Sequence, residues 1–281
     1  MCMGFGCNAA GVVGCRIIDS KRERLIAMLT NALVPCNGRF PTLIALISIF
    51  IITSQGLIGS VAAALILSGF IILSVLVTVM CSKLLSATIL KGEPSSFVLE
   101  LPPYRTPQFG RVIVRSMLDR TLFVLGRSVA FAAPAGLVLW LIANITVGDN
   151  SILVHMADFL EPFGIILGLD GAIILAFILA LPANEIFLPI VLMIYNSGHA
   201  LTEYSGYEEL FSVLSANGWT IVTAICVILF TIFHFPCATT VMTIKKESGK
   251  LRYAVTAVVL PTLVGIFLCF IFNLFFKILL N

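Results

Sequence analysis

Apolar runs long enough to cross a lipid bilayer recur along this 281-residue chain and leave little room for a soluble fold. A helix needs about 20 apolar residues to span the hydrocarbon core. Of all residues 59% are hydrophobic and only 11% are charged, whereas a soluble domain is nearer a quarter charged. We therefore predict an all-α, polytopic membrane protein. The expected spans are residues 41–55, 57–81, 128–146, 218–235 and 253–276.

Basic residues are concentrated in three patches, at 16–24, 105–127 and 245–252. No Lys or Arg occurs from Ser128 to Ile244, a stretch that is rich in acidic residues. Because cytoplasmic loops carry an excess of Lys and Arg, we expect a multi-pass protein of the cell inner membrane with cytosolic basic loops. The loops near 150 and 205 should then lie outside. Each basic patch adjoins an apolar run of membrane length, which indicates topology and contact with membrane lipid rather than nucleic-acid binding.

We interpret residues 1–281 as one membrane permease region with five segments. These are 1–40, with a glycine-rich break and a basic cytosolic stretch; 41–91, a helical hairpin; 92–127, a cytosolic or interfacial amphipathic segment; 128–216, a span plus a broken hairpin; and 217–281, with a last break and the C-terminal span. In the fourth segment, apolar stretches 163–181 and 186–195 flank Leu181–Glu185. The second stretch is too short to cross alone, and loops 147–161 and 197–216 are both expected outside. A broken or re-entrant hairpin satisfies both conditions.

Three cysteines lie where a helix is expected to break: Cys7, Cys36 and Cys237. Glycine and proline free backbone carbonyls from the helical ladder, which a bilayer tolerates only where the backbone lines a cavity or is buried in protein. Flanking residues that complete these breaks are Gly6, Asn8, Asn37 and Pro236. Thiolate and imidazole groups are good ligands for transition metals. Thiols beside freed carbonyls therefore predict a path for a metal cation.

Each of these residues also has a purely structural interpretation. Cys7 can be a packing cysteine at a contact between small residues, and Cys36 can be inert in a turn at the membrane boundary, just before a span. His234 and Cys237, three residues apart around Pro236, can share one ion, or His234 can hydrogen-bond a carbonyl at a helix end. The cysteines in regular contexts are expected to be plain core residues, namely Cys15, Cys81, Cys226 and Cys269.

Asn184 and Glu185 lie between two apolar runs and are flanked by Pro182 and Pro189. A carboxylate at membrane depth is costly, so it suggests a functional site. The alternative is a capping role, with Asn184 as the N-cap of the helix 186–195 and Glu185 in its first turn. Both roles can hold together, since a helix start beside an acidic side chain can bind a cation.

A short internal repeat of the sequence pattern occurs near the two ends of the chain. Gly6–Asn8 is followed by the basic run Lys21–Arg24, and Pro236–Cys237 is followed by Lys245–Glu247. In transporters, broken segments at corresponding positions of two halves indicate a binding site between repeats.

Signatures of an enzyme are absent from the sequence. No G-x-x-x-x-G-K-[ST] motif for nucleotide hydrolysis occurs, nor does H-E-x-x-H, and the three histidines are too scattered for catalytic zinc. The eight cysteines show no close C-x-x-C spacing, and none lies in a predicted external loop, so no disulfide framework is expected. We predict neither an enzymatic activity nor a permanently bound cofactor.

Five motifs in sequence order together resemble one family: Gly4–Asn8, Arg22–Leu25, Pro35–Pro41, Ala183–Ile186 and Phe233–Thr240. Over essentially all of its length the chain resembles the carboxy-terminal membrane portion of the ferrous iron transport protein B (FeoB) family. The resemblance implies that the segments around Cys7 and Cys237 are two gate motifs. It places Cys7, Cys36 and Cys237 at positions proposed to line the iron path, and Asn184–Glu185 on a further family motif.

The resemblance implies a permease that relays partly dehydrated ferrous iron in steps. Soft ligands would be Cys7, Cys36 and Cys237, with His234, Glu185, Asn184 and loop carbonyls as harder ones. Family members begin with a GTP-binding domain, whereas here Met1 lies only six residues before Cys7. The chain thus resembles a truncated product or half of a split transporter. The expected partner is a GTPase domain or subunit, in cis or in trans, and a homo-oligomer is a further option.

Two alternatives stay open. One is a truncated non-transporting subunit that needs a partner chain, and the other is a nucleoside or small-solute carrier with gate-type motifs.

Overall fold

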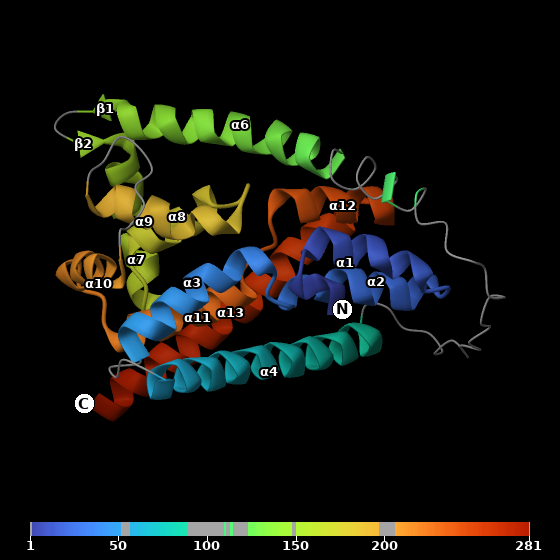
Figure 1. Cartoon of the computed structure of the whole chain (residues 1–281), viewed down its shortest axis with the longest axis horizontal. Helices are drawn as coiled ribbons and strands as arrows, with labels where there is room; N and C mark the ends of the chain where they lie inside the picture. The colour runs from blue at the N-terminus through green and yellow to red at the C-terminus, as the bar shows by residue number, and fades with distance from the viewer. Residues whose placement is uncertain are drawn as a thin grey trace.

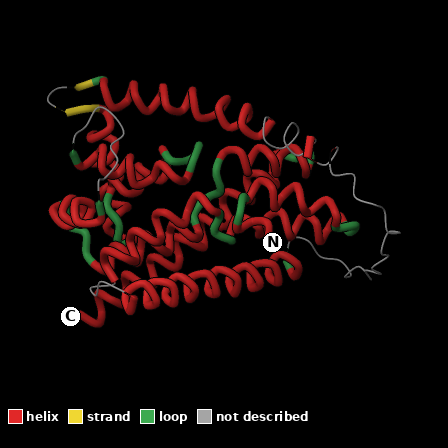
Figure 2. The backbone as a smooth tube through the Cα atoms, viewed as in Figure 1, coloured by secondary structure: helices red, strands yellow, loops and turns green. Residues whose placement is uncertain are grey.

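The computed structural model of this chain is built almost entirely of helices (Figures 1 and 2). It describes residues 2–51, 57–88, 110, 113–114, 123–147, 150–196 and 206–280. Within these ranges the strands are β1 (Thr146–Val147) and β2 (Asn150–Ser151), which pair antiparallel over two residues each. The predicted all-α class is confirmed. Most of the predicted interfacial segment 92–127 lies outside the described residues, and its last residues, 123–127, belong to helix α6 (Phe123–Asn144).

Short helices occupy the first fifty residues, and one long helix follows. In order, the elements are the 3-10 helix η1 (Cys2–Phe5), α1 (Asn8–Gly14), η2 (Cys15–Ile17), α2 (Lys21–Thr30), η3 (Asn31–Leu33), η4 (Asn37–Arg39), α3 (Phe40–Leu46), the π-helix η5 (Ile47–Ile51) and α4 (Leu57–Ala87). Ser20 caps α2, since its hydroxyl oxygen accepts a hydrogen bond from the backbone N–H of Glu23. Pro41 stands in the first turn of α3, where its missing N–H has no intrahelical partner to lose.

One candidate span begins earlier than predicted. The elements from α2 to η5 form one interrupted helical run, Lys21–Ile51, that is apolar and long enough to cross a membrane. We call this run the first broken column. The break at Cys36 therefore lies inside a candidate span, whereas the sequence predicted it just before one. The reason is that side chains on both sides of the break are buried in the core, with Leu33 before it and Leu43 after it fully covered.

The middle of the chain contains more helix than predicted. Its elements are α6 (Phe123–Asn144), β1, β2, α7 (Ile152–Leu167), α8 (Gly171–Leu179), η7 (Asn184–Ile186), α9 (Phe187–Tyr195) and α10 (Tyr207–Ala216). The prediction of external loops at 147–161 and 197–216 was wrong in part, because α7 and α10 occupy many of those residues. Glu208 and Glu209 fall in the first turn of α10, where negative charge favours a helix. Acidic residues that suggested a loop thus support helix formation here.

A sharp bend replaces the single apolar stretch predicted at 163–181. Helices α7 and α8 meet at an angle of 107°, as in a broken span or a re-entrant loop. Gly168 ends α7 in the left-handed region, with a φ of 72° that glycine adopts without strain. Asp170 then starts α8, because its carboxylate accepts the backbone N–H of Ile173 at 2.6 Å. The chain breaks again after α8 and returns through α9, as the predicted hairpin requires.

The C-terminal part contains a second broken column and one continuous helix. These elements are α11 (Ile221–Phe233), α12 (Ala238–Ser248) and α13 (Leu251–Leu280). Helices α11 and α12 together form one candidate span, Ile221–Ser248, so the predicted span 218–235 is only its first half. Among the described residues four helices are long and apolar enough to cross a membrane, or five if the bent pair α7–α8 counts as one span. The apolar part of α6, Ala132–Asn144, is shorter.

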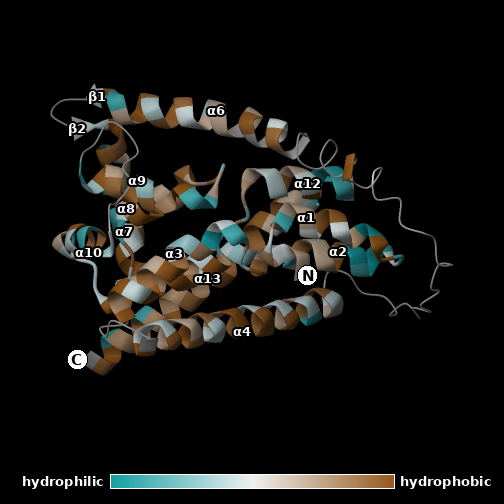
Figure 3. Ribbon diagram, in the orientation of Figure 1, coloured by the Kyte–Doolittle hydropathy of each residue, from teal (hydrophilic) through white to brown (hydrophobic). Residues whose placement is uncertain are grey.

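Helix α11 lies at the centre of the packing, while α4 and α13 lie at its edge. Ile228, Ile232 and Phe233 of α11 are fully covered, whereas α4 and α13 expose many large apolar side chains. In Figure 3 the ribbons of α4 and α13 carry mainly the colours of hydrophobic residues. An exposed apolar surface of this kind is suited to lipid rather than water. The cysteines predicted to be plain core residues are buried, which confirms that prediction for Cys15, Cys81, Cys226 and Cys269.

Candidate functional site

Three segments without α-helix meet in the interior: 31–39 before α3, 180–186 before α9, and 234–237 before α12. We call them the unwound segments, although the first contains the 3-10 turns η3 and η4 and the second contains η7. The backbone N–H of Ala238, the first residue of α12, donates to the carbonyl of Leu181 at 2.9 Å, which joins the start of α12, directly after the third segment, to the second segment. The short helices η4 and η7 pack against each other and join the first to the second. The residues that the sequence analysis singled out are therefore gathered where several helices end.

The contact at the centre of this junction is a row of three side chains, one from each segment. The Asn184 amide nitrogen lies 3.8 Å from Sγ of Cys36, and the Asn184 amide oxygen lies 3.3 Å from Nε2 of His234. Asn184 and His234 are buried, and Cys36 is half-buried. Thiol, amide and imidazole groups predicted from separate parts of the sequence are thus adjacent.

The two ring nitrogens of His234 have different surroundings. Nδ1 lies 2.9 Å from the carbonyl oxygen of Thr231 and 3.1 Å from that of Phe230. These carbonyl oxygens and the Asn184 amide oxygen beside Nε2 can all only accept, and a neutral ring carries one hydrogen. A hydrogen on Nδ1, where the contacts are shorter, therefore leaves a lone pair on Nε2 and makes its approach to the Asn184 oxygen a contact without a hydrogen bond. Carbonyl bonding and ion binding, which the sequence left as alternatives for His234, use different nitrogens and are compatible.

Asn184 does not act as the predicted helix cap. Helix α9 begins at Phe187 and its N-cap residue is Ile186, which makes no side-chain cap. Residues Asn184–Ile186 form the separate 3-10 helix η7, whose N-cap residue is Ala183. The Asn184 amide is committed to His234 and Cys36 instead, which explains why it is not used at the start of α9.

The junction offers a thiol, an imidazole nitrogen and an amide oxygen, together with backbone carbonyls released by the breaks. Sulfur and imidazole favour late first-row divalent metals, and oxygen ligands add harder contacts. Within the described ranges, no three His, Cys, Asp or Glu side chains gather closely enough to hold a metal ion. The arrangement is therefore one of few and mixed ligands, rather than a closed structural metal centre.

Cys7 lies at the start of α1, next to the first of the three unwound segments. It is exposed and precedes the helix with extended backbone angles, φ −150° and ψ 122°. The N–H of Asn37 donates to the carbonyl of Gly6 at 3.3 Å, and the Asn31 amide donates to the carbonyl of Asn8 at 2.9 Å. These contacts place the turn containing Cys7 against the segment containing Cys36.

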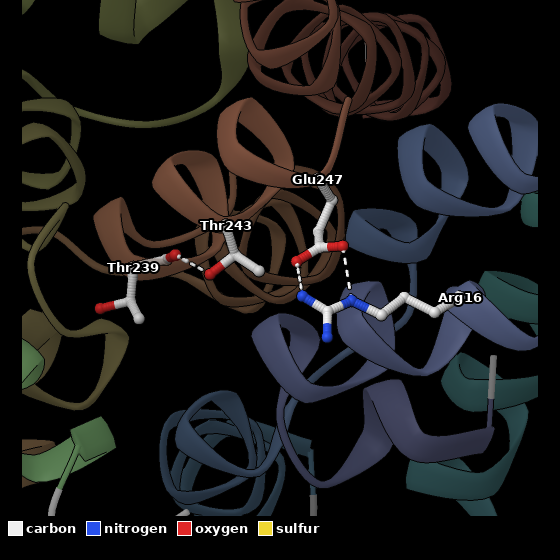
Figure 4. A network of polar contacts seen from close by, with 4 residues as sticks. All are labelled: Arg16, Thr239, Thr243 and Glu247. Carbon is white, nitrogen blue, oxygen red and sulfur yellow. Dashed lines mark hydrogen bonds and ion pairs between the residues drawn. The ribbon is translucent and has the colours of Figure 1, made fainter. Parts of the chain in front are cut away.

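Helices α1 and α12 pack together and run in the same direction (Figure 1). Each begins directly after a cysteine, Cys7 or Cys237. Arg16, just past the end of α1, forms a two-pronged ion pair with Glu247 near the end of α12, with N–O distances of 2.6 and 2.7 Å (Figure 4). The C-terminal end of α1 is thus paired with the C-terminal end of α12. Cys7 and Cys237 therefore both lie at the opposite, N-terminal end of the helix pair. The short internal repeat in the sequence thus corresponds to two parallel short helices.

Exchanging the charges of this ion pair tests the parallel arrangement. We expect Arg16→Glu and Glu247→Arg each to lower the melting temperature of the detergent-solubilised chain, because like charges then face each other. The double exchange should recover it. The effect is expected to be small, since 60% of the Arg16 side chain is exposed to solvent. A double variant no more stable than either single one would contradict this geometry.

Two predicted residues lie beside the central row and have other contacts. The exposed Glu185 carboxylate approaches the backbone of Gly38, so closely that a Cβ on that glycine would lie 3.1 Å from Glu185 Oε1. Cys237 is half-buried and its Sγ lies 3.3 Å from the hydroxyl oxygen of Thr240, one turn into α12. The shared binding of one ion by His234 and Cys237 stays a prediction.

Arg39 is a central residue that the sequence analysis did not single out. It is fully buried, and its guanidinium donates to carbonyls of both the first and the third unwound segments. The signal available in the sequence was a lone arginine between Pro35 and Pro41, in the middle of an apolar run.

Comparison with known families gives two matches along the chain. Residues 43–120 match the family described as "Ferrous iron transport protein B C terminus", and residues 109–251 match the family described as "Nucleoside recognition". The second match covers half of the chain and includes the unwound segments at Asn184 and His234.

Curated relatives cover nearly the whole chain. This chain is 28% identical over 282 residues to a protein of Staphylococcus aureus named "Fe(2+) transporter FeoB", and the match covers 97% of this chain and 39% of that protein. A protein of the same name from Methanocaldococcus jannaschii is 25% identical, covering 98% and 41%. An "Fe(2+) transport protein A/Fe(2+) transporter FeoB fusion protein" of Porphyromonas gingivalis is 25% identical, covering 92% and 35%. The chain thus spans about two fifths of these relatives. No solved structure matches.

Proposed function

We propose, from the premise that this chain belongs to the ferrous iron transport protein B family, that it is the membrane permease part of a ferrous iron uptake transporter. The observation that carries the proposal is the meeting of Cys36, Asn184 and His234 where three helices are interrupted. Relatives named as Fe(2+) transporters support ferrous iron as the transported ion.

The ion would pass from ligand to ligand rather than rest in one site. Cys7, at the exposed start of α1, and Cys237, at the start of α12, would act as soft ligands on either side of the row formed by Cys36, Asn184 and His234. Glu185 and the carbonyls released by the breaks would replace part of the hydration shell. A site with few ligands binds loosely, and loose binding at several places is what conduction requires.

The protein would lie in the inner membrane of the cell. The basic C-terminal ends of α1 and α12 would face the cytosol. Arg16 and Glu247 place the basic stretch after α1 beside the one at the end of α12, so both lie at one boundary of the molecule. Cytosolic loops carry the excess of positive charge. A GTPase domain or subunit, in cis or in trans, would bind on this side and drive or gate transport, while this chain itself would not be an enzyme.

A second candidate function is the carriage of nucleosides or other small solutes. The observation that favours it is the match of residues 109–251 to a family described as "Nucleoside recognition". The cluster of thiol and imidazole groups is better suited to a divalent metal than to a neutral base or sugar.

Competition of uptake separates these two functions. We expect proteoliposomes with the purified chain, a candidate GTPase partner and GTP to take up radioactive ferrous iron under reducing conditions. An excess of unlabelled ferrous iron should suppress the signal, because the soft ligands select for the metal. A mixture of nucleosides should leave it unchanged. Liposomes without protein give the background.

Suppression by nucleosides, together with nucleoside uptake, would instead support the small-solute carrier. Absence of any uptake with every partner supplied would support a non-transporting subunit.

A further inference from the structure

Arg39 lies inside the candidate span Lys21–Ile51 with its side chain fully removed from solvent. Its guanidinium reaches four backbone carbonyl oxygens. Nη1 donates to Ala32 at 3.3 Å and Ile232 at 2.7 Å, and Nη2 donates to His234 and Phe235 at 3.2 Å each. One of these carbonyls belongs to the first broken column, and three belong to the second.

This is an unusual environment for a buried charge. Burying an unpaired charge is costly, so buried arginines are usually paired with carboxylates. In the described part of the chain, the hydrogen-bond partners of the Arg39 guanidinium are all carbonyls. Three of them lie at the C-terminal end of α11, where the helix dipole is negative. The guanidinium thus occupies a cage of carbonyl oxygens, as a bound cation would.

We infer that Arg39 is a positioning residue, a tethered cation that holds the two broken columns together and thereby sets the positions of Cys36 and His234. The inference rests on the proposed function and deepens it, since it names the residue that shapes the ion path without binding the ion. The path itself would be lined by the thiols and by Nε2 of His234.

The connection from Arg39 to both ligands is short. The backbone N–H of Arg39 donates to the carbonyl of Cys36 at 2.9 Å. The turn that bears the Cys36 thiol is therefore hydrogen-bonded to the residue whose side chain occupies the cage. On the other side Nη2 binds the carbonyl of His234 itself. Removal of Arg39 would release both sides of the junction and expose Cys36.

Lysine cannot reproduce this arrangement. Guanidinium is a planar fork whose two terminal nitrogens each donate twice, which matches two pairs of carbonyls in separate directions. An ammonium group is a point donor on a flexible stem and can satisfy only part of the cage. We therefore expect Arg39→Lys to lie between the wild type and Arg39→Ala in every measurement below.

The test measures alkylation of Cys36 by a maleimide in the full chain with all its cysteines, resolved by mass spectrometry of peptides. The variants are Arg39→Ala and Arg39→Lys, with Arg252→Ala as the control, because Arg252 lies at the start of α13 and is exposed. Each protein is also measured with millimolar guanidinium chloride, far below denaturing concentrations. Ferrous iron uptake is recorded in parallel.

We expect Arg39→Ala to alkylate Cys36 about tenfold faster than wild type, the scale set by the loss of charge-assisted hydrogen bonds. Guanidinium should slow that reaction toward the wild-type rate by refilling the cage, and should leave the wild type and Arg252→Ala unchanged. Rescue by the free ion would show that a cation in the carbonyl cage, and not the covalent stem of the side chain, holds Cys36 in place.

A folded Arg39→Ala chain that alkylates at the wild-type rate, or shows no response to guanidinium, would overturn the inference. If Arg39→Ala does not fold, Arg39→Lys decides in its place, and a wild-type rate in that variant would overturn it. The alkylation result does not depend on transport. A wild type without ferrous uptake would thus overturn the proposed function while leaving the role of Arg39 to be decided by alkylation.

Discussion

Cys36→Ser is expected to lower ferrous iron uptake by about tenfold or more in membranes that contain the chain and its GTPase partner, on the scale seen when groups around a metal are altered. Serine keeps nearly the same shape, but its hydroxyl is a hard donor that does not lose its proton at neutral pH. The contact with the Asn184 amide would survive, while the soft ligand at the centre of the junction would be lost. The initial rate of uptake of radioactive ferrous iron, normalised to the amount of protein in the membrane, measures the effect.

The matched control is Cys81→Ala, which removes a thiol from the buried face of α4 outside the three unwound segments. Its uptake should stay near the wild-type rate once corrected for abundance. Uptake at the wild-type rate in Cys36→Ser would remove this thiol from the mechanism. Equal losses in both variants would show that the measurement responds to stability rather than to the ligand.

The same substitution at Cys7 and Cys237 is expected to act in the same direction. Cys7 is exposed and Cys237 is half-buried, and each stands at the N-terminal end of one of the two parallel helices. Both thiols lie beside the central row rather than within it, and that of Cys237 contacts the hydroxyl of Thr240. A smaller loss than for Cys36→Ser is therefore expected. Uptake at parental levels in both variants would confine the path to the central row.

The positions of the helix breaks could be predicted from the sequence because their causes are local. Pro35 and Pro236 each lack the N–H that a continuing helix needs, and cysteines beside them were identified on that ground. The burial of Cys15, Cys81, Cys226 and Cys269 could be predicted from their regular apolar or basic contexts, away from any helix break. Such inferences need only a few neighbouring residues.

The meeting of the breaks could not be predicted, since it depends on packing between distant segments. His234 touches Asn184 across 50 residues, and Arg39 donates to Ile232 across 193. Nothing in the local pattern fixes those distances. The same limit explains why Asn184 was expected to cap the helix that follows it, when its amide is held instead by His234 and Cys36.

The bend between α7 and α8 shows a different limit. The stretch 163–181 is apolar apart from Asp170, and its mean hydropathy gives little reason to divide it. Gly168 and Asp170 supply the end of one helix and the start of the next, but both signals are short and are easily read as interruptions of a single span. Close packing of the two helices at glycine then fixes the angle.

Gly171→Ala is expected to be the most destabilising small substitution at this bend. A Cβ on Gly171 would lie 1.9 Å from the carbonyl oxygen of Ala157 and 2.7 Å from the backbone nitrogen of Glu161. Both atoms belong to the backbone of α7, so the helices themselves must separate. Overpacking of this kind costs about 3 kcal/mol or more. Thermal unfolding of the purified chain in detergent, with the yield of monodisperse protein, measures the loss.

Gly69→Ala in α4 is the matched control, because a Cβ there meets nothing within 4 Å and alanine favours a helix. It should unfold at the wild-type temperature or slightly above. A Gly171→Ala chain as stable as Gly69→Ala would contradict the close approach of α7 and α8. Since α8 leads directly into the segment that carries Asn184, the fraction of Gly171→Ala protein that still folds should also take up ferrous iron slowly. That second loss would link the bend to the junction of the three breaks.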